Sequence, residues 1–196
     1  MFSQCHLRSA YLFARFAAWA GVLCIASSLR AQAGVVGLDG KPLDPFQSSK
    51  GKVVVLVFVR TDCPIANRYA PVLQALSEKY AEKAAFWLVH PSRKESAEVI
   101  RKHGHEFGYK IPAVKDLEGG LVRRSQAQIT PEAAVFDEKG VLTYHGRIDN
   151  LYEDFGHSRK AATTHELQDA IEAAIAGRPP GTASSPAVGC YISDLE

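Results

Sequence analysis

The residue whose position best predicts chemistry is Cys63, which follows a run of seven apolar residues at 53–59. We expect that run to form a strand buried on both faces, and an amphipathic helical pattern begins a few residues after the cysteine. A thiol at a strand-to-helix junction lies at the positive end of the helix dipole, which favours the thiolate over the thiol. Because the thiolate is the nucleophilic form, the sequence predicts a reactive cysteine here.

A second cysteine, Cys190, lies near the end of the chain and could act with Cys63. The other two, Cys5 and Cys24, fall in a segment with the pattern of an export signal, so its removal would leave one pair. A disulfide between Cys63 and Cys190 would enclose 126 residues and stabilise the fold by about 4–5 kcal/mol in the chain-entropy view. The alternatives are that Cys190 pairs with another chain or stays free.

Residues 1–33 have the three parts of a secretory signal peptide. These are a basic start, a short apolar stretch and a small-x-small cleavage site: Arg8 and Arg15, residues 16–29, and Ala31-Gln32-Ala33. The apolar stretch is too short to span a bilayer comfortably. We therefore expect an exported protein, periplasmic or extracytoplasmic, with no stable membrane association after cleavage. An uncleaved membrane anchor is the alternative.

The charge balance argues against several classes of partner. The full chain has 23 basic and 21 acidic residues, for a net charge of +2. Residues 1–33 hold three arginines and no acidic residue, so the mature chain would have 20 basic and 21 acidic residues. Such a near-neutral chain gives no reason to propose nucleic acid or an anionic membrane as a partner. The remaining 163 residues suit a single domain with its own core.

Apolar periodicity predicts an alternation of strands and helices around the two cysteines. Strands are expected at 53–59, 84–89, 133–137 and 141–145, and helices at 67–82, 96–107 and 163–176. Pro71 should kink the first helix or mark its effective start. Ser92 or Ser96 could cap the second helix and Thr164 the third. The turn residues 138–140 indicate a hairpin between the last two strands.

Several short segments resemble the peroxiredoxin-like redoxins (AhpC/TSA type) of the thioredoxin superfamily. They are Asp62-Cys63-Pro64, Thr130-Pro131 followed by residues 132–137, Gly146-Arg147-Ile148-Asp149, and Val188-Gly189-Cys190-Tyr191-Ile192. The resemblance covers about residues 36–192. It implies an α/β, thioredoxin-like fold at 34–177, with a central mixed β-sheet flanked by helices. Residues 178–196 would follow as a C-terminal tail that carries Cys190, and the composition of residues 178–189 predicts little structure there.

The same resemblance implies roles for Thr130 and Pro131. In thioredoxin-like folds a cis-proline precedes an apolar strand, and its loop packs against the reactive sulfur. The Thr130–Pro131 bond is therefore expected to be cis, with the backbone of Thr130 offering hydrogen bonds to an extended substrate.

Several positions differ from those of related families, and these differences argue against some kinds of reaction. Ala66 stands where thioredoxins carry the second cysteine of Cys-x-x-Cys, and Asn67 where copper chaperones of the Sco type carry theirs. Peroxiredoxins carry a proline and a threonine where this chain has Leu56 and Arg60, and an arginine that would align with Pro131. These differences argue against a helix-internal disulfide, a strong copper site and the usual peroxide-binding residues.

Other polar residues give weaker signals. His103 and His105 fall on different faces of one expected helix, which favours exposure to solvent. Arg147 and Asp149 are expected to form a local pair. One of three later histidines could approach Cys63 and complete a metal site: His145, His157 or His165.

The sequence thus predicts an exported thiol–disulfide oxidoreductase that acts through Cys63, Cys190, Thr130 and Pro131. Cys63 would form a mixed disulfide with protein thiols or disulfides, Cys190 would resolve it if it can reach, and a separate reductant would supply electrons. No cofactor and no metal are expected. Two alternatives stay open: an antioxidant thiol peroxidase, in which Cys63 forms a sulfenic acid, and a Sco-like copper-binding chaperone.

Overall fold

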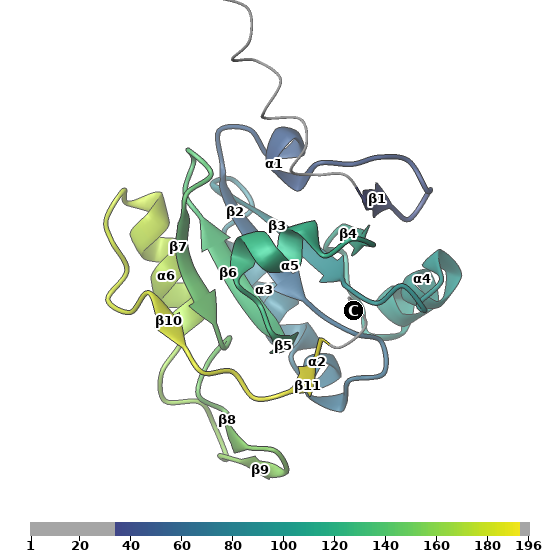
Figure 1. The fold of residues 1–196 in the computed structure, drawn as a ribbon. Coiled ribbons are helices and arrows are strands. Elements are labelled where there is room, and N and C mark those ends of the chain that lie inside the picture. The colour runs from purple at the N-terminus through teal and green to yellow at the C-terminus, as the bar shows by residue number, and fades with distance from the viewer. Residues whose placement is uncertain (1–33, 193–196) are drawn as a thin grey trace, which may run out of the picture. The chain divides into compact units, whose positions relative to one another are not determined.

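A mixed β-sheet forms the centre of the computed structural model, which describes residues 34–192 (Figure 1). Its strands are β1 (Val35–Gly37), β2 (Val53–Phe58), β3 (Ala84–His90), β4 (Ala113–Asp116), β6 (Glu132–Phe136), β7 (Leu142–Gly146) and β10 (Ser184–Ser185). They lie in the order β1-β4-β3-β2-β6-β7-β10. The expected central mixed sheet is confirmed, and the expected signal peptide at 1–33 lies outside the described residues.

Strand β2 occupies the middle of this sheet because its residues are apolar on both faces. It runs parallel to β3 and antiparallel to β6, and all six of its residues are buried. Val55 and Val57 face one hydrophobic cluster, whereas Leu56 and Phe58 face another. The strand therefore separates two cores, as a continuous apolar run predicts. It ends at Phe58, shortly before Cys63.

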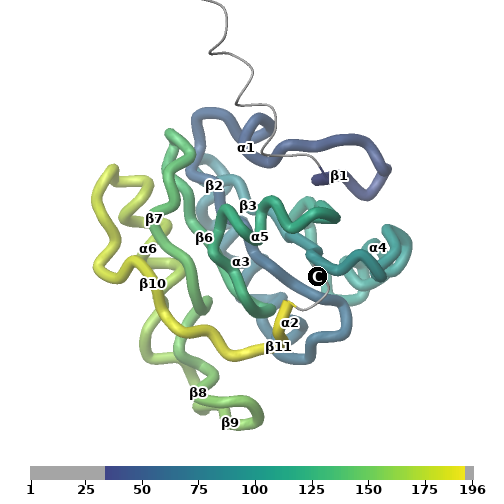
Figure 2. Tube along the Cα trace, viewed as in Figure 1, coloured from purple at the N-terminus to yellow at the C-terminus, as the bar shows by residue number. Residues whose placement is uncertain are grey.

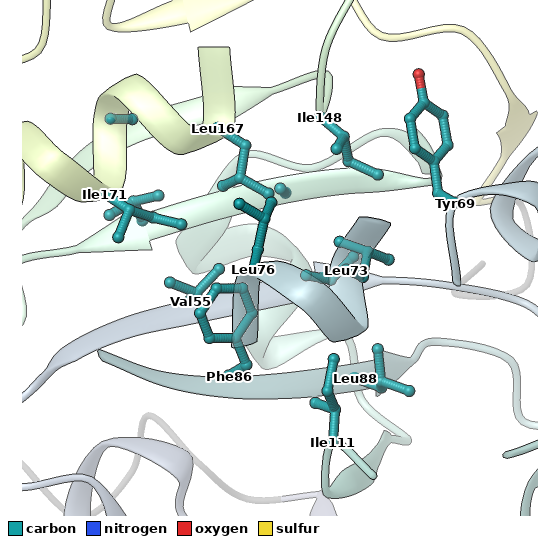
Figure 3. Packing of buried hydrophobic residues seen from close by; sticks show 14 of the residues in the cluster. Val55, Tyr69, Leu73, Leu76, Phe86, Leu88, Ile111, Ile148, Leu167 and Ile171 are labelled. Atoms are coloured by element: carbon teal, nitrogen blue, oxygen red, sulfur yellow. The ribbon is translucent and has the colours of Figure 1, made fainter. Parts of the chain in front are cut away.

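Helices cover both faces of the sheet. They are α1 (Pro45–Ser48), α2 (Pro64–Arg68), α3 (Ala70–Lys79), α4 (Ala97–Glu106), α5 (Gly120–Ser125) and α6 (Glu166–Ile175). Leu73 and Leu76 of α3 pack with Leu167 and Ile171 of α6 in the first cluster (Figure 3). Residues of α1 and α5 contribute to the second cluster. These apolar helix faces hold the sheet and the Cys63 loop in one rigid unit.

The helix boundaries confirm some sequence predictions and correct others. The first helical segment begins at Pro64 rather than at residue 67, and it breaks at Tyr69 so that Pro71 lies in the first turn of α3. Ser96 caps α4, its hydroxyl accepting a hydrogen bond from the Val99 N–H. Thr164 was expected to cap the last helix, which is wrong: α6 starts at Glu166, and the Thr164 hydroxyl donates to the Glu166 carboxylate instead.

The C-terminal segment, residues 178–192, is more ordered than its composition predicts. Strand β10 pairs in parallel with β7, and strand β11 (Cys190–Tyr191) pairs antiparallel with β5 (Ile129–Thr130). Figure 2 shows the segment running from β10 to β11. A further small hairpin is formed by β8 (Tyr152–Asp154) and β9 (His157–Ser158). The C-terminal segment thereby brings Cys190 to the start of α2.

Candidate active site

Cys63 lies in the loop that joins β2 to α2, where it is the N-cap residue of the helix. Its side chain is fully buried, at 0% exposure. The Cys63 N–H donates to the Arg60 carbonyl oxygen at 3.3 Å, and the Cys63 carbonyl accepts from the Asn67 N–H at 3.0 Å. The predicted strand-to-helix position is thus confirmed. The helix that follows has only five residues. The reactivity of the Cys63 sulfur therefore depends mainly on the groups that contact it.

Within residues 34–192, two groups form hydrogen bonds with the Cys63 sulfur. The Cys63 thiol donates to the Thr130 carbonyl oxygen at 3.1 Å, and the Cys190 thiol donates to the Cys63 sulfur at 3.2 Å. Both cysteines are free thiols in this structure. A disulfide needs a sulfur–sulfur distance of about 2.0 Å. A small movement of either side chain would therefore bring within bonding distance two sulfurs that are 127 positions apart in the chain, and oxidation of both thiols would join them.

The loop that carries Thr130 and Pro131 borders this sulfur pair. The Thr130–Pro131 peptide bond is cis, which confirms the geometry predicted for it. Thr130 is fully buried, and its carbonyl faces Cys63. The structure therefore brings together all four residues singled out from the sequence: Cys63, Cys190, Thr130 and Pro131.

The pairing of the C-terminal segment with β5 holds Cys190 beside Cys63. Cys190 lies opposite Thr130 in the register, the Thr130 hydroxyl donates to the Cys190 carbonyl at 3.4 Å, and the Ile192 N–H donates to the Gln128 carbonyl at 2.9 Å. A Cβ atom on Gly189 would lie 2.0 Å from the Thr130 carbonyl oxygen. Only glycine allows this approach, so Gly189 is part of what seats Cys190 against Cys63.

Glu132, which the sequence reading did not single out, holds β5 in place from the other side. Its carboxylate accepts hydrogen bonds from the Gln128 N–H at 2.8 Å and the Ile129 N–H at 3.3 Å. The other carboxylate oxygen lies 3.3 Å from His145 Nδ1. Glu132 is 6% exposed although it sits in an apolar strand. A charged residue inside an otherwise apolar strand is the signal that could have identified it.

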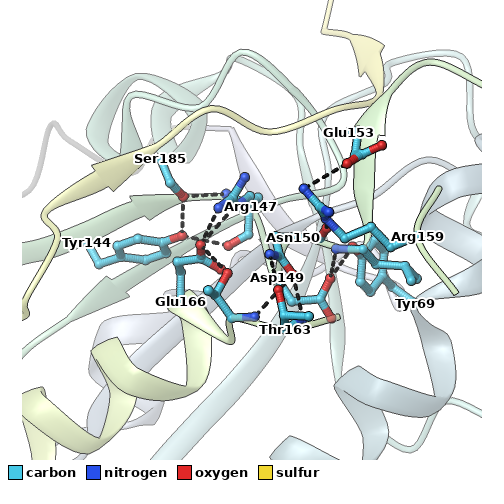
Figure 4. Close-up of polar contacts among 12 residues, drawn as sticks. Tyr69, Tyr144, Arg147, Asp149, Asn150, Glu153, Arg159, Thr163, Glu166 and Ser185 are labelled. Atoms are coloured by element: carbon cyan, nitrogen blue, oxygen red, sulfur yellow. Dashed lines mark hydrogen bonds and ion pairs between the residues drawn. The ribbon is translucent and has the colours of Figure 1, made fainter. Parts of the chain in front are cut away.

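Tyr69 connects the end of α2 to the segment after β7 (Figure 4). Its hydroxyl donates to the Asp149 carboxylate at 2.6 Å, whereas Arg147 pairs with Glu166, Nε to Oε1, at 3.0 Å. The expected Arg147–Asp149 pair is therefore wrong, because each residue has a longer-range partner. Burial, followed by the Asp149 bond, raises the pKa of Tyr69 above its ordinary value, so the phenol stays a donor at neutral pH.

The protonation of the tail cysteine follows from its surroundings. Burial, and then the hydrogen bond to Cys63, raise the pKa of Cys190 to about 11. Cys190 is therefore a neutral thiol near pH 7. In the loop that carries Cys63, the Arg60 guanidinium forms two 3.0 Å bonds with the Asp62 carboxylate. The positive charge of Arg60 is thus partly balanced by Asp62.

Within residues 34–192, no group of three or more histidine, cysteine or acidic side chains is arranged to hold a metal ion. None of the helices in that same range has the length and apolar character needed to cross a bilayer. The third ligand that a Sco-like copper site would need is thus not provided by these residues.

The redoxin family model matches residues 27–160, which include Cys63, Thr130 and Pro131 but not Cys190. A search of curated proteins gives no significant match.

Solved structures share the fold at low sequence identity. A hypothetical protein from Sinorhizobium meliloti is 22% identical, with a TM-score of 0.70 over 81% of this chain and 88% of that one. A secreted Mycobacterium tuberculosis disulfide oxidoreductase homologous to E. coli DsbE is 18% identical, with a TM-score of 0.51 over 77% and 99%. An exposed lipoprotein thioredoxin from Streptococcus pneumoniae is 20% identical, with a TM-score of 0.52 over 73% and 96%. The fold is therefore thioredoxin-like.

Proposed function

Because the chain belongs to the redoxin family, we propose that it is a thiol–disulfide oxidoreductase whose working pair is Cys63 and Cys190. The observation that carries this proposal is the 3.2 Å separation of the two sulfurs beside the Thr130–Pro131 loop. The Dsb-like and thioredoxin neighbours support the same reaction class.

The exchange proceeds through a mixed disulfide. The Cys63 thiolate attacks one sulfur of a substrate disulfide, and the other substrate sulfur leaves as a thiolate. Cys190 then loses its proton and attacks the Cys63 sulfur, which forms the Cys63–Cys190 disulfide and releases the second substrate thiolate. In sum, one substrate disulfide becomes two thiols and two enzyme thiols become one disulfide. A separate dithiol reductant reverses the change in the enzyme.

The burial of Cys63 adds one requirement to this scheme. Its sulfur is closed off by the C-terminal segment and the Thr130 loop, at 0% exposure. A protein substrate can reach it only when β11 separates from β5. That pairing is two residues long, so its separation breaks few bonds. The substrate would then take the backbone position beside Thr130 that Cys190 vacates.

The direct test traps the mixed disulfide. Cys190→Ser should accumulate a covalent adduct on Cys63 when the reduced protein meets glutathione disulfide, whereas the wild-type protein should release glutathione and form its internal disulfide. Intact mass spectrometry distinguishes the two products. Absence of a stable adduct in Cys190→Ser, or an equal amount in the wild type, would contradict a resolving role for Cys190.

A thiol peroxidase is the second candidate, favoured by the same pair of sulfurs because a sulfenic acid on Cys63 could condense with Cys190. Leu56, Arg60 and Pro131 replace the residues that peroxiredoxins use to bind peroxide, and Arg60 is bonded to Asp62. Hydrogen peroxide should therefore oxidise Cys63 no faster than free cysteine, as competition kinetics would measure. A rate orders of magnitude higher would favour the peroxidase.

We further propose that residues 1–33 direct export and that the domain of residues 34–177 works with its tail in an extracytoplasmic compartment. Two cysteines placed to form a disulfide fit such an oxidising environment. Mass spectrometry of the protein expressed with its leader should give a mature N-terminus at Gly34. Retention of the full leader would favour the anchor.

A further inference from the structure

A partly buried polar network holds Thr61, two residues before Cys63. One oxygen of the Glu95 carboxylate accepts hydrogen bonds from both the Thr61 N–H and the Thr61 hydroxyl, each at 2.6 Å. The Asn67 amide donates to the Thr61 carbonyl oxygen at 3.2 Å. The N–H, hydroxyl and carbonyl of Thr61 are thereby all bonded to two side chains from elsewhere in the chain.

Two buried histidines hold these side chains in turn. His90 Nδ1 lies 3.0 Å from the second Glu95 carboxylate oxygen, and His103 Nε2 lies 2.7 Å from the Asn67 amide oxygen. His90 is 1% exposed and His103 is 6% exposed, so the expectation that His103 faces solvent is wrong. Their rings meet edge to face with centroids 6.5 Å apart. Two chains of hydrogen bonds, one through His90 and Glu95 and one through His103 and Asn67, therefore meet at Thr61.

The proton positions follow from the bonding pattern. Burial by itself would raise the pKa of Glu95, but the bonds from His90 and Thr61 lower it to about 2. Glu95 is thus a carboxylate, and His90 Nδ1 must donate to it. Because the Asn67 NH₂ group donates to Thr61, its oxygen accepts from His103 Nε2. Each link in the network then has a donor and an acceptor.

Such a network contributes little net free energy to the stability of a fold. Buried ionic and polar groups often contribute no more to stability than apolar residues of similar size, although they can specify one arrangement. His90 Nε2 meets no hydrogen-bond partner within residues 34–192, which adds to the cost. The members come from the end of β3, the loop before α4, α4 itself and α2, so they fix the Cys63 loop relative to three elements. This arrangement favours a role in positioning.

We propose that Glu95 and Asn67 are positioning residues for the exchange between Cys63 and Cys190, acting through Thr61. By fixing Thr61 they fix the turn from Arg60 to Cys63, and so the place where the Cys63 sulfur meets the Cys190 sulfur. The proposal rests on the function proposed above. It also gives a role to Asn67, which stands four residues after Cys63.

The test is the equilibrium between the reduced protein and glutathione disulfide. Two protein thiols are oxidised to the Cys63–Cys190 disulfide while one glutathione disulfide is reduced to two glutathione molecules. The equilibrium constant gives the effective concentration of one sulfur at the other. Small displacements of reacting groups lower such values by about ten- to a hundredfold, and we expect losses in this range for Glu95→Ala and Asn67→Ala.

Two further variants serve as references. Glu95→Gln keeps an oxygen that can accept a hydrogen bond from Thr61. Its effective concentration should therefore fall much less than that of Glu95→Ala. Glu98→Ala removes an exposed carboxylate in the first turn of α4 and should leave the effective concentration unchanged. Urea unfolding of each reduced variant confirms that the comparison is made between folded proteins.

The outcomes separate the two proposals. A wild-type protein that forms no internal disulfide would overturn the proposed function. A wild-type protein that forms it, with the same effective concentration in Glu95→Ala, Asn67→Ala and Glu98→Ala, would overturn the positioning role alone. Lower unfolding free energies without a change in effective concentration would also overturn it, because they would assign the network to stability only.

Discussion

Cys190 carries the proton that lies between the two sulfurs. Its thiol donates to the Cys63 sulfur, and its raised pKa of about 11 keeps that proton in place near neutrality. The two cysteines therefore differ in task although both are thiols in this structure: Cys63 lies in the fixed loop and Cys190 on a short, separable strand. Resolution requires Cys190 to give up its proton once the Cys63 sulfur carries a substrate.

The pH dependence of Cys190 alkylation tests this difference. Because burial and the bond to Cys63 favour the protonated form, the labelling rate with iodoacetamide should reach half its maximum near pH 11, well above the ordinary thiol value of about 8.5. Mass spectrometry of the peptide that contains Cys190 gives the rate. In Cys63→Ala the midpoint should fall only in part, since burial is the larger cause. A midpoint near that of free cysteine in the wild type would show that Cys190 is solvated.

Glu95 should make the reduced protein sensitive to acid. Its folded pKa of about 2 is below its ordinary value of 4.5, so its stabilising contribution is present above pH 4.5 and is lost as the pH falls towards 2. Urea unfolding should give a smaller loss of stability between pH 5 and pH 2 for Glu95→Gln than for the wild type. Glu98→Gln should follow the wild type. Equal losses in all three proteins would refute the low pKa.

At the scale of elements, the pairing of β11 with β5 decides whether Cys63 is reachable. Gly189 permits it, because any Cβ there would overlap the Thr130 carbonyl. Val188 and Ile192 on either side pack against the two hydrophobic clusters, which adds apolar contact to a short ladder. The C-terminal segment therefore acts as a cover that carries the second sulfur.

Gly189→Val tests this element. Overpacking costs about 1–3 kcal/mol, which would favour the separated segment by roughly 5- to 150-fold. In the reduced protein, Cys63 alkylation should accelerate by a similar factor, while formation of the internal disulfide should slow. Gly181→Val is the matched control, since a Cβ at Gly181 meets nothing within 4 Å. Equal alkylation rates in the two variants would argue against a covering role.

The elements that the sequence predicts well are those with a long periodic signal. The seven-residue apolar run at 53–59, the hairpin around residues 138–140 and the helix start near Pro71 all have local causes, and the structure contains them. The two-residue strands β5, β10 and β11 have no period to detect. Their pairing depends on contacts with distant residues, so the C-terminal segment looked unstructured in the sequence.

The residues of the candidate site also fall into two groups, those that a sequence motif indicates and those that it does not. Cys63, Thr130 and Pro131 stand in short motifs, and their convergence follows from the fold that those motifs indicate. Glu95 is bonded to the backbone of Thr61 in the site, yet its sequence surroundings resemble an ordinary surface segment. Side-chain partners across 34 positions, as for Thr61 and Glu95, cannot be inferred from spacing.

At the scale of the whole molecule, the Cys63–Cys190 pair joins the first and last parts of the described fold. A disulfide across so long a loop would restrict the unfolded chain and raise the free energy of unfolding by about 4–5 kcal/mol at most. The oxidised protein should therefore unfold at a higher urea concentration than the reduced protein. Cys190→Ser should show no such difference between the two conditions. A reduced wild type as stable as the oxidised form would mean that the bond strains the native structure.

The central claim is that Cys63 and Cys190 exchange between dithiol and disulfide, and peptide mapping under non-reducing conditions tests it most directly. The reduced protein is equilibrated with glutathione disulfide, blocked with an alkylating agent and digested with trypsin. The account predicts that residues 61–68 will be recovered covalently linked to the peptide that carries Cys190, and that dithiothreitol will separate them. Recovery of the two peptides unlinked, each alkylated or joined to glutathione, would contradict it.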